Sequence, residues 1–166
     1  MKPMLKGALA ALAAGLILAA GGGGAWAMGS TSTPPASTSS GGSSAATDAD
    51  YTAGEQAVNA GKYADAVGLM QKVVGRSPQN ADAWNYLGFS YRKLGKFPDA
   101  LKAYEKALAI NPDHLGANEY LGELYVETGD MPKAEARLAR LDKLCGSGCE
   151  QYRALKSAID AKKKSS

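Results

Sequence analysis

The two cysteines of the chain lie close together, in the segment Cys145-Gly146-Ser147-Gly148-Cys149. Two thiols at this spacing can form a disulfide, act as a dithiol redox pair or supply two ligands to a metal site. The glycines give the segment freedom to bring the sulfur atoms together. Because the N-terminal residues described below indicate export to an oxidising compartment, we expect a structural disulfide between Cys145 and Cys149. A redox pair and a metal-handling site are the alternatives.

The other ionisable side chains form no recognisable catalytic set. Catalysis needs a nucleophile beside a base, carboxylates that face each other across a cleft, or a set of metal ligands. The only histidine, His114, falls at a predicted junction between elements, and two thiolates alone are too few for a zinc site. The sequence therefore predicts a protein that is not an enzyme and has no cofactor or metal.

Regularly spaced glycines indicate the elements that must position these side chains. Gly54, Gly88 and Gly122 stand 34 residues apart. A glycine inside a helix costs about 1 kcal/mol relative to alanine, so three in register indicate places where another part of the chain comes close. A period of 34 residues is typical of helix-turn-helix units that stack into an array. The same offsets recur in a second set of glycines and a set of alanines: Gly61, Gly95, Gly129, Ala66, Ala100 and Ala134.

The middle unit, residues 81–114, resembles the tetratricopeptide repeat family. Its first predicted helix carries Trp84, Leu87, Gly88 and Tyr91 on one side, and its second carries Ala100, Tyr104 and Ala107 on the facing side, before Pro112. The units at about 47–80 and 115–148 keep the glycines but lose bulk, with Asn118 in the place of Trp84. The predicted fold is all-α: a right-handed helical-repeat solenoid of about three helix-turn-helix units.

A last helix is predicted over residues 149–162. It carries Tyr152, Leu155 and Ile159 on one stripe, and we expect it to cap the uncovered apolar face of the third unit. A helix that docks on another protein is the alternative. The repeat domain is thus predicted over residues 48–162, with a disordered tail at 163–166.

The resemblance also implies a binding surface, because in this family the first helix of each repeat lines an inner groove. Phe89 is then expected to act as an apolar anchor, Asn85 to form hydrogen bonds and Arg92 to pair with an acidic group, although Phe89 could instead pack beneath Tyr120. Some relatives hold C-terminal carboxylates in a basic clamp, but Tyr51, Glu55 and Tyr120 occupy the corresponding positions. The implied contact residues are Tyr51, Glu55, Asn85, Phe89, Arg92, Lys93, Glu119, Glu123 and Glu127.

Three of these residues, Glu119, Glu123 and Glu127, follow one another at helical spacing, so that their charges repel. Stacking of the units should bring Arg92 and Lys93 near the end of this acidic stripe. We interpret the stripe as an internally paired or solvated face, with a site for a basic ligand as the alternative.

The N-terminus predicts export. Lys2 and Lys6 precede an apolar run over residues 8–20, and Ala25-Trp26-Ala27 has the pattern of a cleavage site. The run is shorter than the roughly 20 residues needed to span a bilayer. We expect a signal peptide over 1–27, a disordered Ser/Thr/Gly/Pro linker over 28–47 and a periplasmic location. An uncleaved segment that anchors the chain in the inner membrane is the alternative.

Net charge gives no indication of nucleic-acid binding. Loss of Lys2 and Lys6 with the signal would lower the formal charge of +3 by two, to +1. The only basic run, Lys162 to Lys164, is interpreted as a solvated tail.

The predicted function is a non-enzymatic protein–protein interaction adaptor or scaffold of the bacterial cell envelope. Its expected partner is a protein or peptide, not a nucleic acid, and it meets a membrane only if the signal segment stays uncleaved. A thiol redox or metal-handling factor that uses Cys145 and Cys149 is the alternative function.

Overall fold

The structure is a computed structural model that describes residues 48–165. This part of the chain folds into helices joined by short turns and has no strand, which confirms the predicted all-α helical-repeat fold. The predicted signal peptide at 1–27 and linker at 28–47 lie outside the described residues. The helices are α1 (Ala49–Asn59), α2 (Tyr63–Arg76), α3 (Ala81–Lys93), α4 (Phe97–Ile110), α5 (Leu115–Thr128), α6 (Met131–Cys145) and α7 (Glu150–Lys164).

Polar side chains begin four of these helices. Asp48, Asn80, His114 and Asp130 each accept a hydrogen bond from a backbone N–H of the first turn that follows. Such bonds satisfy N–H groups that have no partner within the helix. His114 accepts through Nδ1 from the backbone N–H of Ala117, at 3.2 Å. The only histidine of the sequence therefore has a structural task at the start of α5.

The second set of repeated glycines turns the chain between the two helices of each unit. Gly61, Gly95 and Gly129 have φ values of +71°, +72° and +85°. Side chains rarely tolerate this left-handed region, and glycine adopts it without penalty. Each tight turn brings the second helix back against the first, so α1 pairs with α2, α3 with α4 and α5 with α6.

The first set of glycines lies where the paired helices come closest. A Cβ atom added to Gly54 would lie 2.6 Å from Cε of Met70, and one added to Gly88 would lie 2.7 Å from the ring of Tyr104. Met70 and Tyr104 are both fully buried. The predicted close approach therefore occurs within the first and second units.

The third unit differs at this position. The space at Gly122 is filled by Leu155 of α7, whose Cδ2 would lie 2.4 Å from an added Cβ. Leu138 of α6, the counterpart of Met70 and Tyr104 in the repeat, is only partly buried. The last helix thus supplies a packing side chain of the third unit, in addition to covering that unit.

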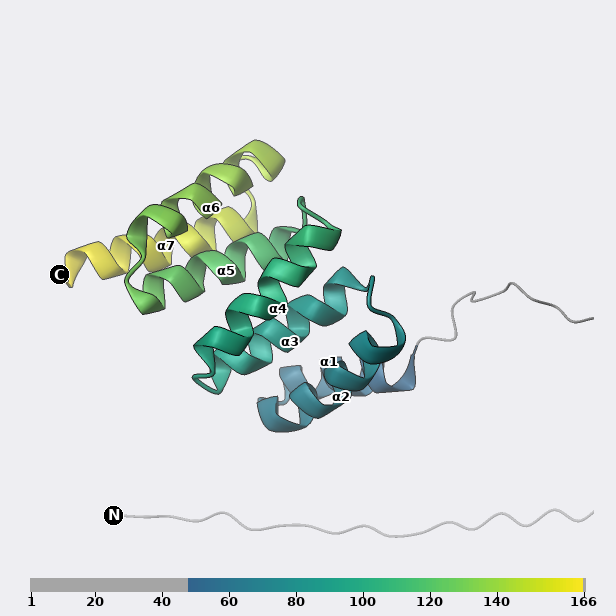
Figure 1. Ribbon diagram of the computed structural model, residues 1–166. Helices are drawn as coiled ribbons and strands as arrows, with labels where there is room; N and C mark the ends of the chain where they lie inside the picture. Colours follow the sequence, from purple (N-terminus) through teal and green to yellow (C-terminus); the bar gives the residue numbers. More distant parts are fainter. Residues whose placement is uncertain (1–47, 166) are drawn as a thin grey trace, which may run out of the picture. The chain divides into compact units, whose positions relative to one another are not determined.

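Helix α7 packs against both α5 and α6 and runs to Lys164, two residues past its predicted end. Figure 1 shows the helices of residues 48–165 stacked in chain order, with α7 beside α5 and α6. Leu155 and Ile159 of α7 are buried in one cluster with Val126, Ala134 and Leu141. These contacts agree with the predicted capping role. No helix within residues 48–165 has the length and apolar character needed to cross a membrane.

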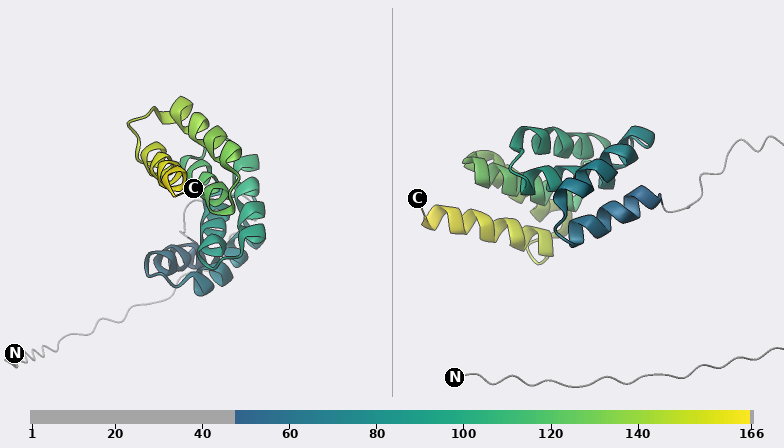
Figure 2. Two further views of the ribbon diagram at one scale, coloured as in Figure 1. Left: turned by 90° about the vertical axis from the view of Figure 1, so that its left-hand side faces the viewer. Right: turned by 90° about the horizontal axis from the view of Figure 1, so that it is seen from below.

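The stack is curved, and the first helices of the units lie on its inner side. Contacts join α1 to α3, α3 to α5 and α5 to α7, whereas none join α2 to α4 or α4 to α6 among the described helices. The first helices are therefore closer together than the second ones, and the array bends toward them. Figure 2 shows the resulting crescent in its left-hand view.

Candidate functional site

The inner side of the crescent carries three rows of side chains, which we call the inner face. Residues within a row stand 34 positions apart in the sequence and come in turn from α1, α3 and α5. The surface combines rings, amides and charges, and it brings together the residues that the family resemblance implied. The rows are Tyr51, Asn85 and Glu119; Glu55, Phe89 and Glu123; and Asn59, Lys93 and Glu127.

Aromatic rings connect the units across this face. The ring centroids of Phe89 and Tyr120 are 4.9 Å apart, and those of Phe89 and Tyr63 are 6.0 Å apart. Tyr51 and Tyr86 meet edge to face at 5.9 Å. Phe89 is half-buried between its two tyrosines, which confirms the alternative in which it packs against Tyr120. Its exposed part remains available as an apolar contact on the inner face.

Arg92 corrects one predicted role. Its Nη2 lies 2.6 Å from Glu123 and its Nη1 lies 2.5 Å from Glu127, and only 3 % of its side chain is exposed. Burial opposes the charged guanidinium, but Tyr104, Glu123 and Glu127 outweigh it and hold the pKa of Arg92 above the ordinary arginine value. Arg92 is therefore committed to carboxylates of this chain and is not presented to an acidic ligand.

The same ion pairs explain how the acidic stripe of α5 is tolerated. Arg92 comes from the neighbouring unit and neutralises part of the charge of Glu123 and Glu127. The guanidinium also lies 5.5 Å from the ring centroid of Phe89 and 5.7 Å from that of Tyr120. The interpretation of the stripe as an internally paired face is thus confirmed for these two glutamates.

Glu119, the first member of the stripe, is not paired in this way. It is 8 % exposed, and within residues 48–165 it forms neither a hydrogen bond nor an ion pair. Burial, followed by the charges of Glu123 and Glu150, raises the pKa of the Glu119 carboxyl from 4.5 to about 7, against the opposite effect of Arg92. The inner face therefore contains a buried carboxyl that has no partner in the described chain.

Asn85 holds the equivalent position one unit earlier and is also buried, at 6 % exposure. Its side chain faces the start of α5, where Nδ2 would lie 3.2 Å from a Cβ placed on Gly116. Within residues 48–165 its Oδ1 has no hydrogen-bond partner. Asn85 is thus less accessible than its predicted role suggested, because α5 covers it.

Tyr86, a residue of the site, was not singled out from the sequence. It donates a hydrogen bond from its hydroxyl to Glu55 at 2.9 Å, and burial with this bond raises the pKa of Tyr86 to about 12. Tyr86 stands two residues after Trp84 on α3, so the amphipathic pattern of that helix could have placed it, but its bond to Glu55 spans two units.

A hollow, which we call the outer hollow, lies away from the inner face, between α2, α3 and α4. Its volume is about 640 Å³, and Trp84, Leu87 and Tyr91 line it together with charged residues of α4 such as Asp99 and Lys102. The hydroxyl of Tyr91 accepts a hydrogen bond from Gln71 at its edge. None of the inner-face residues contributes to this hollow.

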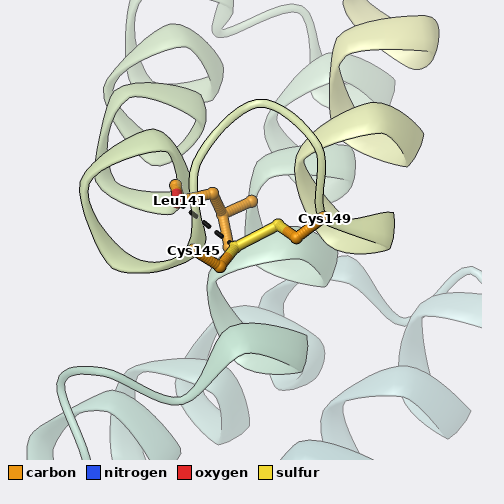
Figure 3. Close-up of a disulfide and its surroundings, with 3 residues drawn as sticks. All are labelled: Leu141, Cys145 and Cys149. Atoms are coloured by element: carbon orange, nitrogen blue, oxygen red, sulfur yellow. Dashed lines mark hydrogen bonds between the residues drawn. A yellow bond between two sulfur atoms is a disulfide. The ribbon is translucent and has the colours of Figure 1, made fainter.

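The cysteine pair joins α6 to α7. In the structure Cys145 and Cys149 are bonded as a disulfide, with Cα atoms 5.8 Å apart. Figure 3 shows Cys145 close to the last turn of α6, where its Sγ lies 3.3 Å from the carbonyl oxygen of Leu141. A disulfide sulfur has no proton to donate, so this is a close contact and not a hydrogen bond. The bridge thus links the third unit to the helix that completes it.

Comparison with known proteins identifies the repeat. Two sequence models of the tetratricopeptide repeat match the chain, over residues 51–89 and 81–114. No curated protein matches the sequence. The structure is similar to the crystal structure of MamA, with a TM-score of 0.61 and 22 % identity over 69 % of this chain and 67 % of that one.

Two further similar structures contain peptides. The first tetratricopeptide domain of Spaghetti (RPAP3), bound to the HSP90 peptide SRMEEVD, has a TM-score of 0.61 and 21 % identity over 68 % of this chain and 91 % of that one. The Yersinia enterocolitica chaperone SycD, in complex with a peptide of the translocator YopD, has a TM-score of 0.62 and 18 % identity over 70 % and 91 %. At these identities the similarity shows the fold.

Proposed function

We propose that this chain, which is a tetratricopeptide repeat protein, is a non-enzymatic adaptor that holds a peptide or protein segment of a partner against its inner face. The observation that carries the proposal is the curvature of the stack. It gathers rings and polar groups from three helices on one concave side. Peptides bound to similar solved structures support it, and extended concave surfaces are what such arrays offer to partners.

We place this activity in the bacterial cell envelope, in the periplasm after removal of residues 1–27. The support is the N-terminal pattern of two lysines, an apolar run and a small-residue cleavage site. An inner-membrane anchor formed by the uncleaved segment is the alternative. Mass spectrometry of the protein from its native cell distinguishes them, because a mature chain that starts at Met28 requires cleavage and an intact Met1 contradicts it.

Site-specific photo-crosslinking in intact cells tests the adaptor function. A photoreactive residue is placed at Lys93 or Asn59, which are exposed on the inner face, and at Lys102 beside the outer hollow as a matched control. We expect one partner to be captured from both inner positions and not from Lys102. Capture from Lys102 alone would contradict the assignment of the inner face.

The alternative function, a thiol redox or metal-handling factor, depends on Cys145 and Cys149. Within residues 48–165 no group of three or more His, Cys, Asp or Glu side chains is arranged to hold a metal ion. The redox role can be tested directly by the reduction potential of the pair. A structural disulfide is expected to have a reduction potential below about −300 mV, whereas a potential well above this value would favour the redox role.

A further inference from the structure

We infer that the segment held by the inner face is basic, and that the face receives its lysine or arginine side chains. This inference rests on the adaptor function proposed above and specifies its ligand. It reverses the sign of the partner charge expected from Arg92 in the sequence.

The charges of the inner face support this sign. Glu55, Glu119, Glu123 and Glu127 lie in its three rows, and Lys93 is the exposed cation among them. Arg92 lies beneath the rows, where two of the glutamates already bind it. Its charge therefore stabilises the chain itself and leaves an excess of carboxylate for a partner.

A further carboxylate extends this excess beyond α5. Glu150, at the start of α7, is close enough to Glu119 and Tyr120 for its charge to act on both groups. An acidic segment such as SRMEEVD, the peptide in the Spaghetti structure, would therefore meet like charges here. Like charges brought together at an interface exclude a partner.

Glu119 gives independent support, because its carboxyl has no donor. The residue is 8 % exposed, and within residues 48–165 its carboxyl forms neither a hydrogen bond nor an ion pair. A carboxylate largely withdrawn from water without a donor is unfavourable. Lysine and arginine side chains carry donors only, so they match Glu119 in both hydrogen bonding and charge.

The aromatic rings of the inner face suit the remainder of a basic side chain. Nζ of Lys93 already lies 5.2 Å from the ring centroid of Phe89. Tyr63 and Tyr120 flank Phe89 and are each half-buried. Ring faces attract cations, and the alkyl stems of lysine and arginine pack on apolar surface. The inner face therefore offers apolar surface for the alkyl stem of a basic side chain and acceptors for its charged group.

Binding of two designed peptides tests the inference. The peptides have the same length and apolar residues, with lysine in one and glutamate in the other at the same positions, and fluorescence anisotropy follows binding. We expect the lysine peptide to bind more tightly. At pH 8, where the Glu119 carboxyl is mostly ionised, the double variant Glu55→Gln with Glu119→Gln should weaken its binding by about tenfold, since it removes two acceptor charges at the site.

A matched double variant separates the site from general charge attraction. Asp99→Asn with Glu105→Gln removes the same charge from exposed positions of α4, away from the inner face. It should leave the affinity for the lysine peptide unchanged. Equal weakening by both double variants, or tighter binding of the glutamate peptide, would overturn the inference. Circular dichroism checks that all variants keep their helices.

The photo-crosslinking experiment distinguishes failure of this inference from failure of the adaptor function. Capture from Lys93 and Asn59 of a segment without lysine or arginine would overturn the basic ligand and leave the adaptor intact. Absence of any capture from the inner face would contradict the adaptor function itself.

Discussion

Arg92 illustrates how neighbours determine what a residue at a groove position can do. On its own helix it lies beside Lys93, with a similar charge and a similar place in the repeat. Stacking of the next unit surrounds Arg92 with Glu123, Glu127 and two aromatic rings, while Lys93 stays exposed. A planar guanidinium suits such a site because it can bind two carboxylates and stack on rings at the same time.

Replacement of Arg92 by methionine should destabilise the fold by about 2–3 kcal/mol, because Glu123 and Glu127 would be left without their partner near Glu119. Urea unfolding measures the loss. The matched control is Lys93→Met, whose exposed charge should change stability by less than about 0.5 kcal/mol. An equal effect of both variants would mean that the buried ion pairs contribute nothing specific.

Glu119 makes stability depend on pH. Burial and the charges of Glu123 and Glu150, only partly offset by Arg92, raise the pKa of Glu119 from 4.5 to about 7 in the folded protein. The folded chain therefore binds a proton that the unfolded chain releases between these values. The favourable contribution of the neutral carboxyl is complete below about pH 4.5 and declines as pH rises toward 7 and beyond.

Glu119→Gln should remove this dependence. At pH 8 the variant is expected to be more stable than the wild type by roughly 1–3 kcal/mol, and at pH 4 the two should be about equal. Urea unfolding at both values tests it, with Glu105→Gln on the exposed side of α4 as the control. A wild type that is as stable as the variant at pH 8 would show that Glu119 is not destabilised by its surroundings.

At the scale of the helices, each glycine of the first repeated set lets a large side chain pack close to its helix, but that side chain does not always come from the same helix of the unit. Met70 and Tyr104 come from the second helix of their own units, whereas Leu155 comes from the helix that follows the third unit. Asn118 likewise forms an equivalent contact with a different side chain. It stands in the third unit where the second has Trp84. Its Nδ2 donates a hydrogen bond to the carbonyl oxygen of Pro112, just as Nε1 of Trp84 donates one to the carbonyl oxygen of Pro78.

Leu155→Ala should cost about 3 kcal/mol, since the side chain is fully buried and a cavity would remain at Gly122. Leu138→Ala removes the same atoms from the position that the repeat pattern assigns to this contact, but Leu138 is only partly buried. Its cost should be about half as large. Chemical unfolding compares them, and a larger loss at Leu138 would contradict the role assigned to Leu155.

At the scale of the helical array, the third unit is complete only with α7. Each unit of such a stack contacts its immediate neighbours, so an end without a cover exposes apolar surface. Here the cover is attached by a turn of four residues, 146–149, and by the bond between Cys145 and Cys149. Lys163 of α7 also reaches Glu135 of α6, at 2.6 Å.

The double variant Cys145→Ser with Cys149→Ser should lower stability by about 2 kcal/mol, the value that the chain-entropy model assigns to so short a loop. Hydrogen exchange should increase in α7 more than in α1 to α4, because the bridge restrains only the last helix. The wild-type protein treated with reductant should show the same loss of stability and the same increase in hydrogen exchange as the double variant. Uniform exchange changes across all helices would contradict a local role.

The sequence alone determined the repeating architecture. Glycine, alanine and aromatic residues recur every 34 positions, and proline and turn glycines stand between the helices, so local preferences and packing periods agree. The pattern of Tyr152, Leu155 and Ile159 likewise identified α7 as a cap. The resemblance to the repeat family predicted the inner-face residues from their positions in the repeat, because that position decides on which side of a helix a residue lies.

Tertiary structure decided what those residues are free to do. Burial of Arg92, its pairing with Glu123 and Glu127, and the absence of a described partner for Glu119 depend on how far α5 is displaced from α3. The entry of Leu155 at Gly122 depends on the path of α7. Such relations join residues of different units, and a one-dimensional period does not contain the distance between stacked helices, on which both burial and charge pairing depend.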